Sequence, residues 1–189
     1  MRTCLTSCLL VSSLALLAQA QAPAPSGAPD ATVVANPTYI SIPLEIDVNK
    51  PAAEVWKRVG KYCDIGEWLQ IPCTITSGKD GEFGAVRSVG GEILVGKTDM
   101  SYTYTQTVKA GRPYNLYHGT LEAKPVTATT SKLVYTLVFD NSMLADDAAR
   151  DKDRAQKSAT FMRALQNMKT LAEGGTLPPP PARGGGKKQ

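Results

Sequence analysis

Histidine is almost absent from this sequence, and histidine is the commonest metal ligand and the commonest general base in enzyme active sites. The only histidine is His118, and there is no Cys-x-x-Cys motif, so the paired ligands of a structural zinc site are missing. Acid–base catalysis near neutral pH would depend first on His118. This residue shares a strand face with Glu122 and Lys124, which favours a position in solvent. No glycine-rich phosphate loop, nucleophile elbow or paired-carboxylate motif is present. We therefore expect no metal and no cofactor, and the motifs assign no catalytic residue.

A strong excess of either charge is also lacking. The formal net charge is +4, and part of it comes from Lys187 and Lys188 near the C-terminus. Nucleic-acid-binding proteins typically carry a basic stripe with interleaved aromatic residues, and the sequence has none. We therefore expect no nucleic-acid partner, and the sequence does not indicate a protein partner.

Long apolar runs are missing except near the N-terminus, where residues 9–18 are mostly apolar and Arg2 is the only charged residue nearby. The following Ala18-Gln19-Ala20 has the small-x-small form of a signal-peptidase site. The run is too short to span a bilayer. We expect residues 1–20 to be a signal peptide that is removed near Ala20, which gives a secreted or periplasmic protein without a stable membrane span. A lipoprotein signal is the weaker alternative, because Cys8 precedes the apolar run.

Residues 21–37 and 174–189 contain few large apolar residues and many prolines, glycines and alanines. Such segments cannot bury enough apolar surface to order themselves, so we expect both to be flexible. Residues 38–173 between them are long enough for one domain with a hydrophobic core. This domain contains two cysteines, Cys63 and Cys73. Export to an oxidising compartment favours a disulfide between them, and two separate buried thiols are the alternative.

Hydroxyl and bulky side chains alternate in the segment MSYTYTQTV, residues 100–108. Successive residues of a strand point to opposite faces, so Thr103 and Thr105 would share one face, and Tyr102 and Tyr104 the other. The threonine face can contact water. In a dry core the tyrosine hydroxyls would be unpaired, at about 1–3 kcal/mol each. The pattern therefore predicts that these tyrosines face a partly polar space.

The remaining patterns predict a strand over residues 38–48, a short helix that starts at Pro51 and a second at residues 64–69. Further strands are expected at residues 73–76, 85–89, 92–97, 100–108, 114–124 and 132–140, followed by a long helix over residues 142–173 capped by Asn141 or Ser142. Strands joined by short turns form an antiparallel sheet, and only the long helix could cover its apolar face. We predict an α+β fold in which a curved antiparallel sheet of six to seven strands wraps around the C-terminal helix. Two short helices after the first strand would close one end, and a cavity would lie between sheet and helix.

Five segments carry a resemblance to a known fold: NKPAAEVWKRVGKYCDIGEWL (49–69), GEFGAVRSV (81–89), DMSYTYTQ (99–106), PYNLYHGTLEAKPV (113–126) and KLVYTLVFD (132–140). In this order they resemble the helix-grip fold of the START-like superfamily over residues 38–173. Its members include the birch-pollen-allergen and abscisic-acid-receptor proteins and the bacterial polyketide cyclase/dehydrase and lipid-transport proteins. The resemblance implies a ligand-binding domain with a cavity for a hydrophobic molecule. Leu69 stands where many relatives carry histidine, and the gate and latch loops of the receptors are absent, so hormone sensing is not implied.

Eight side chains are expected to line this cavity: Trp68, Tyr102, Tyr104, Tyr117, Leu121, Tyr135, Phe161 and Leu165. The alternative is that they are ordinary core residues, and a one-residue bulge would reverse any strand face. Trp68 could be either a portal residue or an anchor for the helices that close the end. The simplest expectation for Arg87 is that its side chain is exposed to solvent. If buried, it would need a partner such as Glu92 or Asp99, and it could then hold an acidic group of a ligand.

These expectations favour an exported binding or transport protein for a hydrophobic small molecule such as a lipid, sterol, polyketide or aromatic metabolite. A polyketide cyclase or dehydratase that uses the same cavity is the first alternative. In that case the tyrosines, with His118 or Arg87, would polarise carbonyl groups. The second alternative is an interaction module of the cell envelope in which side chains fill the core.

Overall fold

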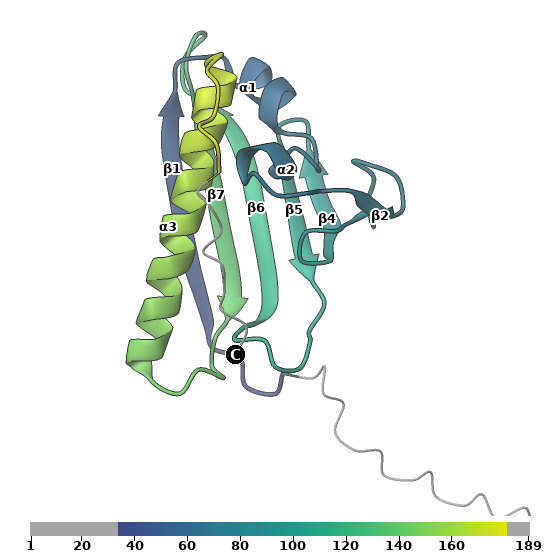
Figure 1. Cartoon of the computed structure of the whole chain (residues 1–189), viewed down its shortest axis with the longest axis vertical. Coiled ribbons are helices and arrows are strands. Elements are labelled where there is room, and N and C mark those ends of the chain that lie inside the picture. Colours follow the sequence, from purple (N-terminus) through teal and green to yellow (C-terminus); the bar gives the residue numbers. More distant parts are fainter. Residues whose placement is uncertain (1–33, 181–189) are drawn as a thin grey trace, which may run out of the picture. The chain divides into compact units, whose positions relative to one another are not determined.

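The computed structural model describes residues 34–180, so the predicted signal peptide and the last residues of the C-terminal segment lie outside the described residues. Seven strands form one antiparallel sheet in the order β1-β7-β6-β5-β4-β3-β2 (Figure 1). They are β1 (Tyr39–Val48), β2 (Ile75–Ser77), β3 (Val86–Arg87), β4 (Glu92–Thr98), β5 (Ser101–Gln106), β6 (Asn115–Pro125) and β7 (Ser131–Asp140). The predicted α+β helix-grip fold is confirmed.

Bulky side chains and small polar side chains lie on opposite faces of the strands, and the face with the bulky side chains is buried. In β5, Tyr102, Tyr104 and Gln106 are buried, and the intervening serine and threonines lie on the opposite face. On that face Thr103 Oγ1 and Thr120 Oγ1 form a hydrogen bond of 2.8 Å between β5 and β6. β7 follows the same period, with every second residue from Ser131 to Phe139 buried. The tyrosines therefore belong to the inner face, as the sequence pattern predicts.

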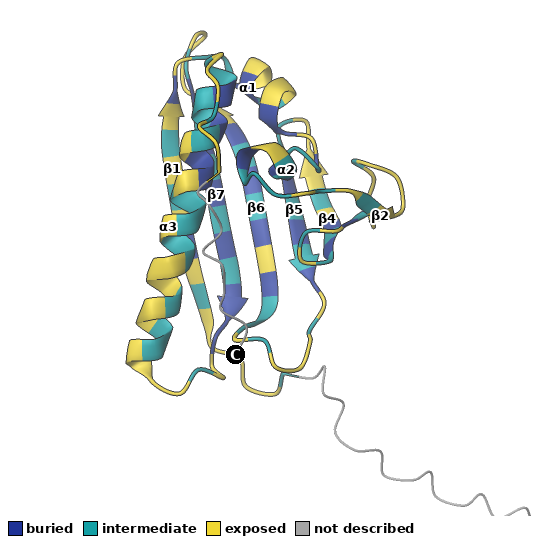
Figure 2. Cartoon of the chain, viewed as in Figure 1, coloured by how far each residue is buried: buried dark blue, intermediate teal, exposed yellow. Residues whose placement is uncertain are grey.

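Three helices cover the inner face of the sheet (Figure 1): α1 (Ala52–Val59), α2 (Ile65–Trp68) and α3 (Asp147–Ala172). α3 packs against β1 and β7, while α1 contacts β6 and α3. The buried residues of α3 are Ala164, Leu165, Met168 and Leu171, all in its C-terminal half. Figure 2 shows that the first turns of α3 are mainly exposed. The core therefore lies where the end of α3, the two short helices and the middle strands meet.

The long helix begins later than the sequence pattern indicates, so the prediction that Asn141 or Ser142 caps it is wrong. The Asp140 carboxylate at the end of β7 accepts hydrogen bonds from the backbone N–H groups of Ser142 and Thr38, at 3.0 and 2.8 Å. These bonds hold a turn after β7. The helix cap is Asp146, whose Oδ1 accepts from the Ala149 N–H at 2.7 Å.

The region between α1 and β4 contains more turns than predicted. β2 covers residues 75–77 instead of 73–76, and β3 is reduced to Val86–Arg87 from the predicted 85–89. Gly84 and Gly90 flank β3 with φ of 81° and 66°, a left-handed conformation that ends an extended strand. The predicted disulfide joins Cys63 to Cys73 across this region.

Candidate ligand-binding site

Four tyrosines from three neighbouring strands form a layer on the inner face of the sheet: Tyr102 and Tyr104 from β5, Tyr117 from β6 and Tyr135 from β7. None is more than 5% exposed. The hydroxyls of Tyr104 and Tyr135 are 2.8 Å apart and satisfy one another. The Tyr102 hydroxyl is also buried, and it has no hydrogen-bond partner among residues 34–180. The layer is therefore only partly satisfied by its own members.

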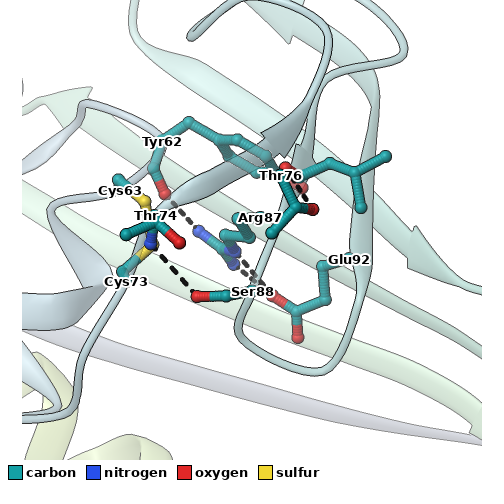
Figure 3. The surroundings of a disulfide bond; sticks show 9 residues. Tyr62, Cys63, Cys73, Thr74, Thr76, Arg87, Ser88 and Glu92 are labelled. Atoms are coloured by element: carbon teal, nitrogen blue, oxygen red, sulfur yellow. Dashed lines mark hydrogen bonds and ion pairs between the residues drawn. A yellow bond between two sulfur atoms is a disulfide. The ribbon is translucent and has the colours of Figure 1, made fainter.

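Arg87 lies behind this layer and is completely buried, which corrects the expectation of a solvated side chain. Its Nε and Nη2 atoms each lie 2.6 Å from Oε2 of Glu92, and its Nη1 donates to the Tyr62 backbone oxygen at 2.5 Å. Figure 3 shows the guanidinium between these two partners, close to the disulfide. On the other side, Oε1 of Glu92 accepts from the Gln106 amide at 3.0 Å. Glu92 is thus the partner that a buried Arg87 requires.

Aromatic rings enclose the guanidinium. The Arg87 Cζ atom lies 4.3 Å from the ring centroid of Tyr62, 4.7 Å from that of Tyr104 and 5.7 Å from that of Tyr102. The negative faces of aromatic rings attract a cation at such distances. Tyr62 and Tyr102 also meet edge to face, with centroids 5.5 Å apart. The charge is therefore held by a carboxylate, a backbone carbonyl and three rings.

Burial sets the protonation of this cluster. It raises the pKa of five phenols above the ordinary value: Tyr62, Tyr102, Tyr104, Tyr117 and Tyr135. Burial also raises the pKa of the Glu92 carboxyl, and the Arg87 charge opposes that shift. At neutral pH the phenols are therefore hydrogen-bond donors rather than bases.

A cavity of about 370 Å³ opens on the other side of Tyr62 and Tyr102, between α1, β4, β5 and the segment that leads to β3. Its apolar wall is formed by Trp56, Tyr62, Leu94 and Tyr102, and its other lining residues are Lys57, Gly60, Lys61, Asp80, Gly81, Lys97, Thr98 and Ser101. The Trp56 and Tyr102 rings lie 5.7 Å apart. A Cβ atom added to Gly60 would come within 2.4 Å of the Trp56 ring, so glycine at this position allows the ring to lie where it does.

A second cavity of about 240 Å³ lies between α2, α3 and the C-terminal segment. Trp68, Arg163 and Asn167 contribute to its lining, together with residues 178–180. The Gln70 amide donates to the backbone oxygen of Pro178 at 2.6 Å, which holds the C-terminal segment against this cavity. Trp68 itself is completely buried, and its ring meets that of Tyr135 edge to face.

The eight residues expected to line a cavity are distributed over three places. Tyr102 lines the larger cavity and Trp68 the smaller. The other six belong to the packed interior and line neither cavity: Tyr104, Tyr117, Leu121, Tyr135, Phe161 and Leu165. Phe161 packs on Tyr135 with the ring centroids 4.7 Å apart. Four of these side chains, Tyr104, Leu121, Tyr135 and Leu165, are completely buried.

Two aromatic residues of the larger cavity, Trp56 and Tyr62, were not expected there. Trp56 lies on α1 beside the buried Val55 and is only partly buried, and no local sequence pattern distinguishes it from a core residue. Tyr62 comes shortly after the end of α1 at Val59 and directly precedes Cys63, so the disulfide holds it beside the sheet. Among residues 34–180, no group of histidine, cysteine, aspartate and glutamate side chains has a geometry that could hold a metal ion. None of the helices in this part of the chain is both long and apolar enough to cross a bilayer.

The sequence was compared with models of known protein families. The family of polyketide cyclase/dehydrase and lipid transport proteins matches residues 39–173, from the first residue of β1 to the residue after α3. The chain belongs to this family. No curated protein sequence matches it significantly.

Solved structures show the same fold at low sequence identity. A solution NMR structure from Thermobifida fusca has a TM-score of 0.59 and 21% identity, with 72% of this chain and 97% of that chain covered. The ZhuI aromatase/cyclase from Streptomyces sp. R1128 has a TM-score of 0.56 and 15% identity, with 74% and 100% covered. The di-domain aromatase/cyclase BexL of the BE-7585A pathway has a TM-score of 0.53 and 18% identity, with 71% and 46% covered. The fold is therefore shared with proteins of this kind, which does not by itself assign an activity.

Proposed function

We propose that the protein binds a hydrophobic small molecule in the cavity beside α1. The observation that carries this proposal is the aromatic wall of Trp56, Tyr62 and Tyr102 around a space of about 370 Å³. Ligand sites are typically concave, mostly apolar and about 300–1,000 Å³ in volume. This cavity is near the lower limit, so it suits a compound of one to three rings or one short chain better than a two-chain lipid.

Apolar contact would supply most of the affinity. Each Å² of apolar surface removed from water contributes about 25 cal/mol before the costs of ordering the ligand are subtracted. The wall is already organised for this, because Tyr102 packs edge to face on Tyr62 and tilted against Trp56. Rings that keep their place in the empty site lose little entropy when a ligand binds.

This proposal shifts the expected site from the space under α3 to the edge of the sheet. Under α3, the hydroxyl bond between Tyr104 and Tyr135 and the packing of Phe161 occupy the interior. Export is part of the proposal. The disulfide between Cys63 and Cys73 fits an oxidising compartment, as does the N-terminal segment that we interpret as a signal peptide.

The two tryptophans of the chain allow a direct test by fluorescence. In a Trp68→Phe variant, Trp56 is the only tryptophan, and we expect its emission to change on titration with aromatic compounds. In the matched Trp56→Phe variant, Trp68 lies away from the cavity, so its emission should be unaffected and the affinity lower.

Native mass spectrometry of protein purified from its own host should show a bound small molecule. Protein that carries no ligand and that responds to none of a panel of lipids and aromatic compounds would refute the proposal, and would favour the alternative of an envelope interaction module with a filled core.

A second candidate function is cyclisation or dehydration of a polyketide-like substrate. It is favoured by one observation: Tyr62 and Tyr102 line the cavity, and the Arg87 Cζ atom lies 4.3 and 5.7 Å from their ring centroids, so protonated phenols and a fixed cation lie close to the cavity. Such groups can stabilise negative charge that develops on a carbonyl oxygen. A linear β-keto thioester would be the assay substrate. If the protein is an enzyme, Tyr102→Phe should lower turnover while binding is retained, whereas a carrier should show no turnover above the uncatalysed rate in either form.

A further inference from the structure

The charged residues of the larger cavity are of predominantly one sign. Lys57 and Lys61 reach it from the last turn of α1 and the turn that follows, and Lys97 reaches it from β4. Asp80 is the only carboxylate among its lining residues. The mouth of the cavity therefore carries three ammonium groups and one carboxylate.

Within residues 34–180, none of these three lysines lies within ion-pairing distance of a carboxylate, although the Lys61 charge opposes the rise in the pKa of Asp64 that burial causes. Within residues 34–180, neither Lys57 nor Lys61 forms an ion pair, and Lys97 Nζ donates to the backbone oxygen of Gly81 at 2.7 Å. Five other lysines of the domain are paired with carboxylates, whereas Lys50, Lys109 and Lys152, which do not line the cavity, are not; the paired lysines are Lys79, Lys124, Lys132, Lys157 and Lys169. The positive charge at the cavity is therefore uncompensated by a side chain within hydrogen-bonding distance.

The apolar and charged parts of the lining occupy different depths. Tyr62, Leu94 and Tyr102 are each at most 3% exposed and form the floor. Lys57 and Lys97 are exposed side chains at the rim. A ligand that satisfies both parts has an apolar body and an anionic group at one end, because an ammonium group attracts a carboxylate more strongly beside a low-dielectric wall than in open water.

We infer that the cavity takes an aromatic carboxylate, with its rings against Trp56, Tyr62 and Tyr102 and its carboxylate among Lys57, Lys61 and Lys97. This inference rests on the proposed function and adds the chemical class of the ligand. Asp80 disfavours a second negative charge beside the loop before β3, so a monoanion fits better than a dianion.

Three probes of the same size and different charge test the inference: 2-naphthoate, methyl 2-naphthoate and 2-naphthylmethylammonium. Affinities are measured at pH 7 in the Trp68→Phe background and confirmed by calorimetry on the unmodified protein. We expect the carboxylate to bind at least about tenfold more tightly than the ester, which is the combined effect of several partly exposed charge contacts. The difference should shrink in 0.5 M salt, because ions screen exposed charges.

Two triple variants locate the effect. Lys57→Gln/Lys61→Gln/Lys97→Gln should abolish the preference, so that the carboxylate binds no more tightly than the ester. The control Lys50→Gln/Lys109→Gln/Lys152→Gln removes the same net charge from lysines that do not line the cavity, and it should keep the preference. Equal affinity for all three probes, tighter binding of the ammonium compound, or the same loss in both triple variants would overturn the inference while the proposed function stands. Failure of the unmodified protein to bind any of the three probes, when it binds another lipid or aromatic compound of the panel, would overturn this inference alone. Failure to bind the whole panel would overturn the proposed function as well.

Discussion

The ring of Tyr104 lies directly over Gly119, its cross-strand neighbour in β6. A Cβ atom added to Gly119 would come within 2.3 Å of both Cζ and the hydroxyl oxygen of Tyr104. The absence of a side chain at Gly119 thus creates the space in which the tyrosine lies flat on the sheet. From this position its hydroxyl reaches that of Tyr135 on β7.

Gly119→Ala should therefore destabilise the domain by about 1–3 kcal/mol, the usual cost of overpacking a core. The methyl group would displace the Tyr104 ring and break its hydroxyl bond to Tyr135. Urea denaturation measures the change in the free energy of unfolding. Gly96→Ala in β4 is the matched control, because a Cβ atom there meets Thr103 at an ordinary 3.4 Å. Equal stability of the two variants would contradict this account of Gly119.

Removing either partner of the buried Arg87–Glu92 pair should destabilise the domain strongly, and the two effects should not add. Arg87→Met or Glu92→Gln alone leaves an uncompensated group in the core and should cost about 3–5 kcal/mol. The double variant should lose less than the sum of the two, with a coupling energy of about 1–3 kcal/mol.

The exposed pair Arg58–Glu67 is the control for this cycle, because its hydrogen bonds are as short, at 2.7 and 2.6 Å, but lie in solvent. Its coupling energy should be below about 1 kcal/mol. If both cycles gave the same value, burial would not be the source of the Arg87–Glu92 coupling.

The order of elements was predictable because it depends on local periodicity. The alternation predicts strands over residues 100–108 and 132–140, and the structure has them at Ser101–Gln106 and Ser131–Asp140, with the predicted faces. Tyr117 also faces inward, although Leu116 has a φ of 49° and the pairing shifts register between Asn115 and His118. Tyr117 nevertheless shares the buried face of Gly119 and Leu121, which follow it at the strand period.

The site was less predictable because it depends on which distant segments meet. Nothing in the local pattern around Arg87 shows that Tyr62, which is 25 residues earlier, will place its carbonyl on the guanidinium. The cavity could not be predicted from local patterns either, because its wall combines residues at the end of α1 with residues of β4 and β5. The sequence identified Tyr102, whose face is fixed by its strand, but it could not identify Trp56, whose partner Tyr102 lies across the domain.

Alkaline titration should report the buried phenols. The pKa of Tyr104 is raised by burial well above its ordinary value of 10.0, and that of Tyr135 likewise. A phenol that holds its proton more tightly when folded stabilises the protein fully below about pH 10. That contribution is lost as the pH rises above this value, at up to about 1.4 kcal/mol per pH unit for each group.

We therefore expect absorbance at 295 nm to show fewer ionised tyrosines at pH 11 in the folded protein than in urea. The free energy of unfolding should also fall between pH 9 and pH 11, and Tyr135→Phe should reduce the slope of this fall. A folded protein that titrates all seven of its tyrosines near pH 10 would contradict the burial of the layer.

The disulfide should support both the fold and the ligand site. Cys63 follows Tyr62, whose ring forms part of the cavity and whose carbonyl binds Arg87, and Cys73 precedes Thr74, which pairs with Ser88 beside Arg87. The bond closes a short loop with a sequence separation of 10. Restricting such a loop in the unfolded chain corresponds to about 3 kcal/mol. Cys63→Ser/Cys73→Ser should therefore lower the free energy of unfolding by about 2–3 kcal/mol and weaken binding of 2-naphthoate, because Tyr62 is less firmly held.

Reduction of the unmodified protein should reproduce both effects, and reduction of the double variant should change neither. Urea denaturation and the Trp56 fluorescence titration measure the two effects separately. If stability fell while the affinity of the folded protein stayed the same, the disulfide would hold the chain together without organising the cavity. The position of Tyr62 would then depend on its packing against Tyr102 and Arg87 alone.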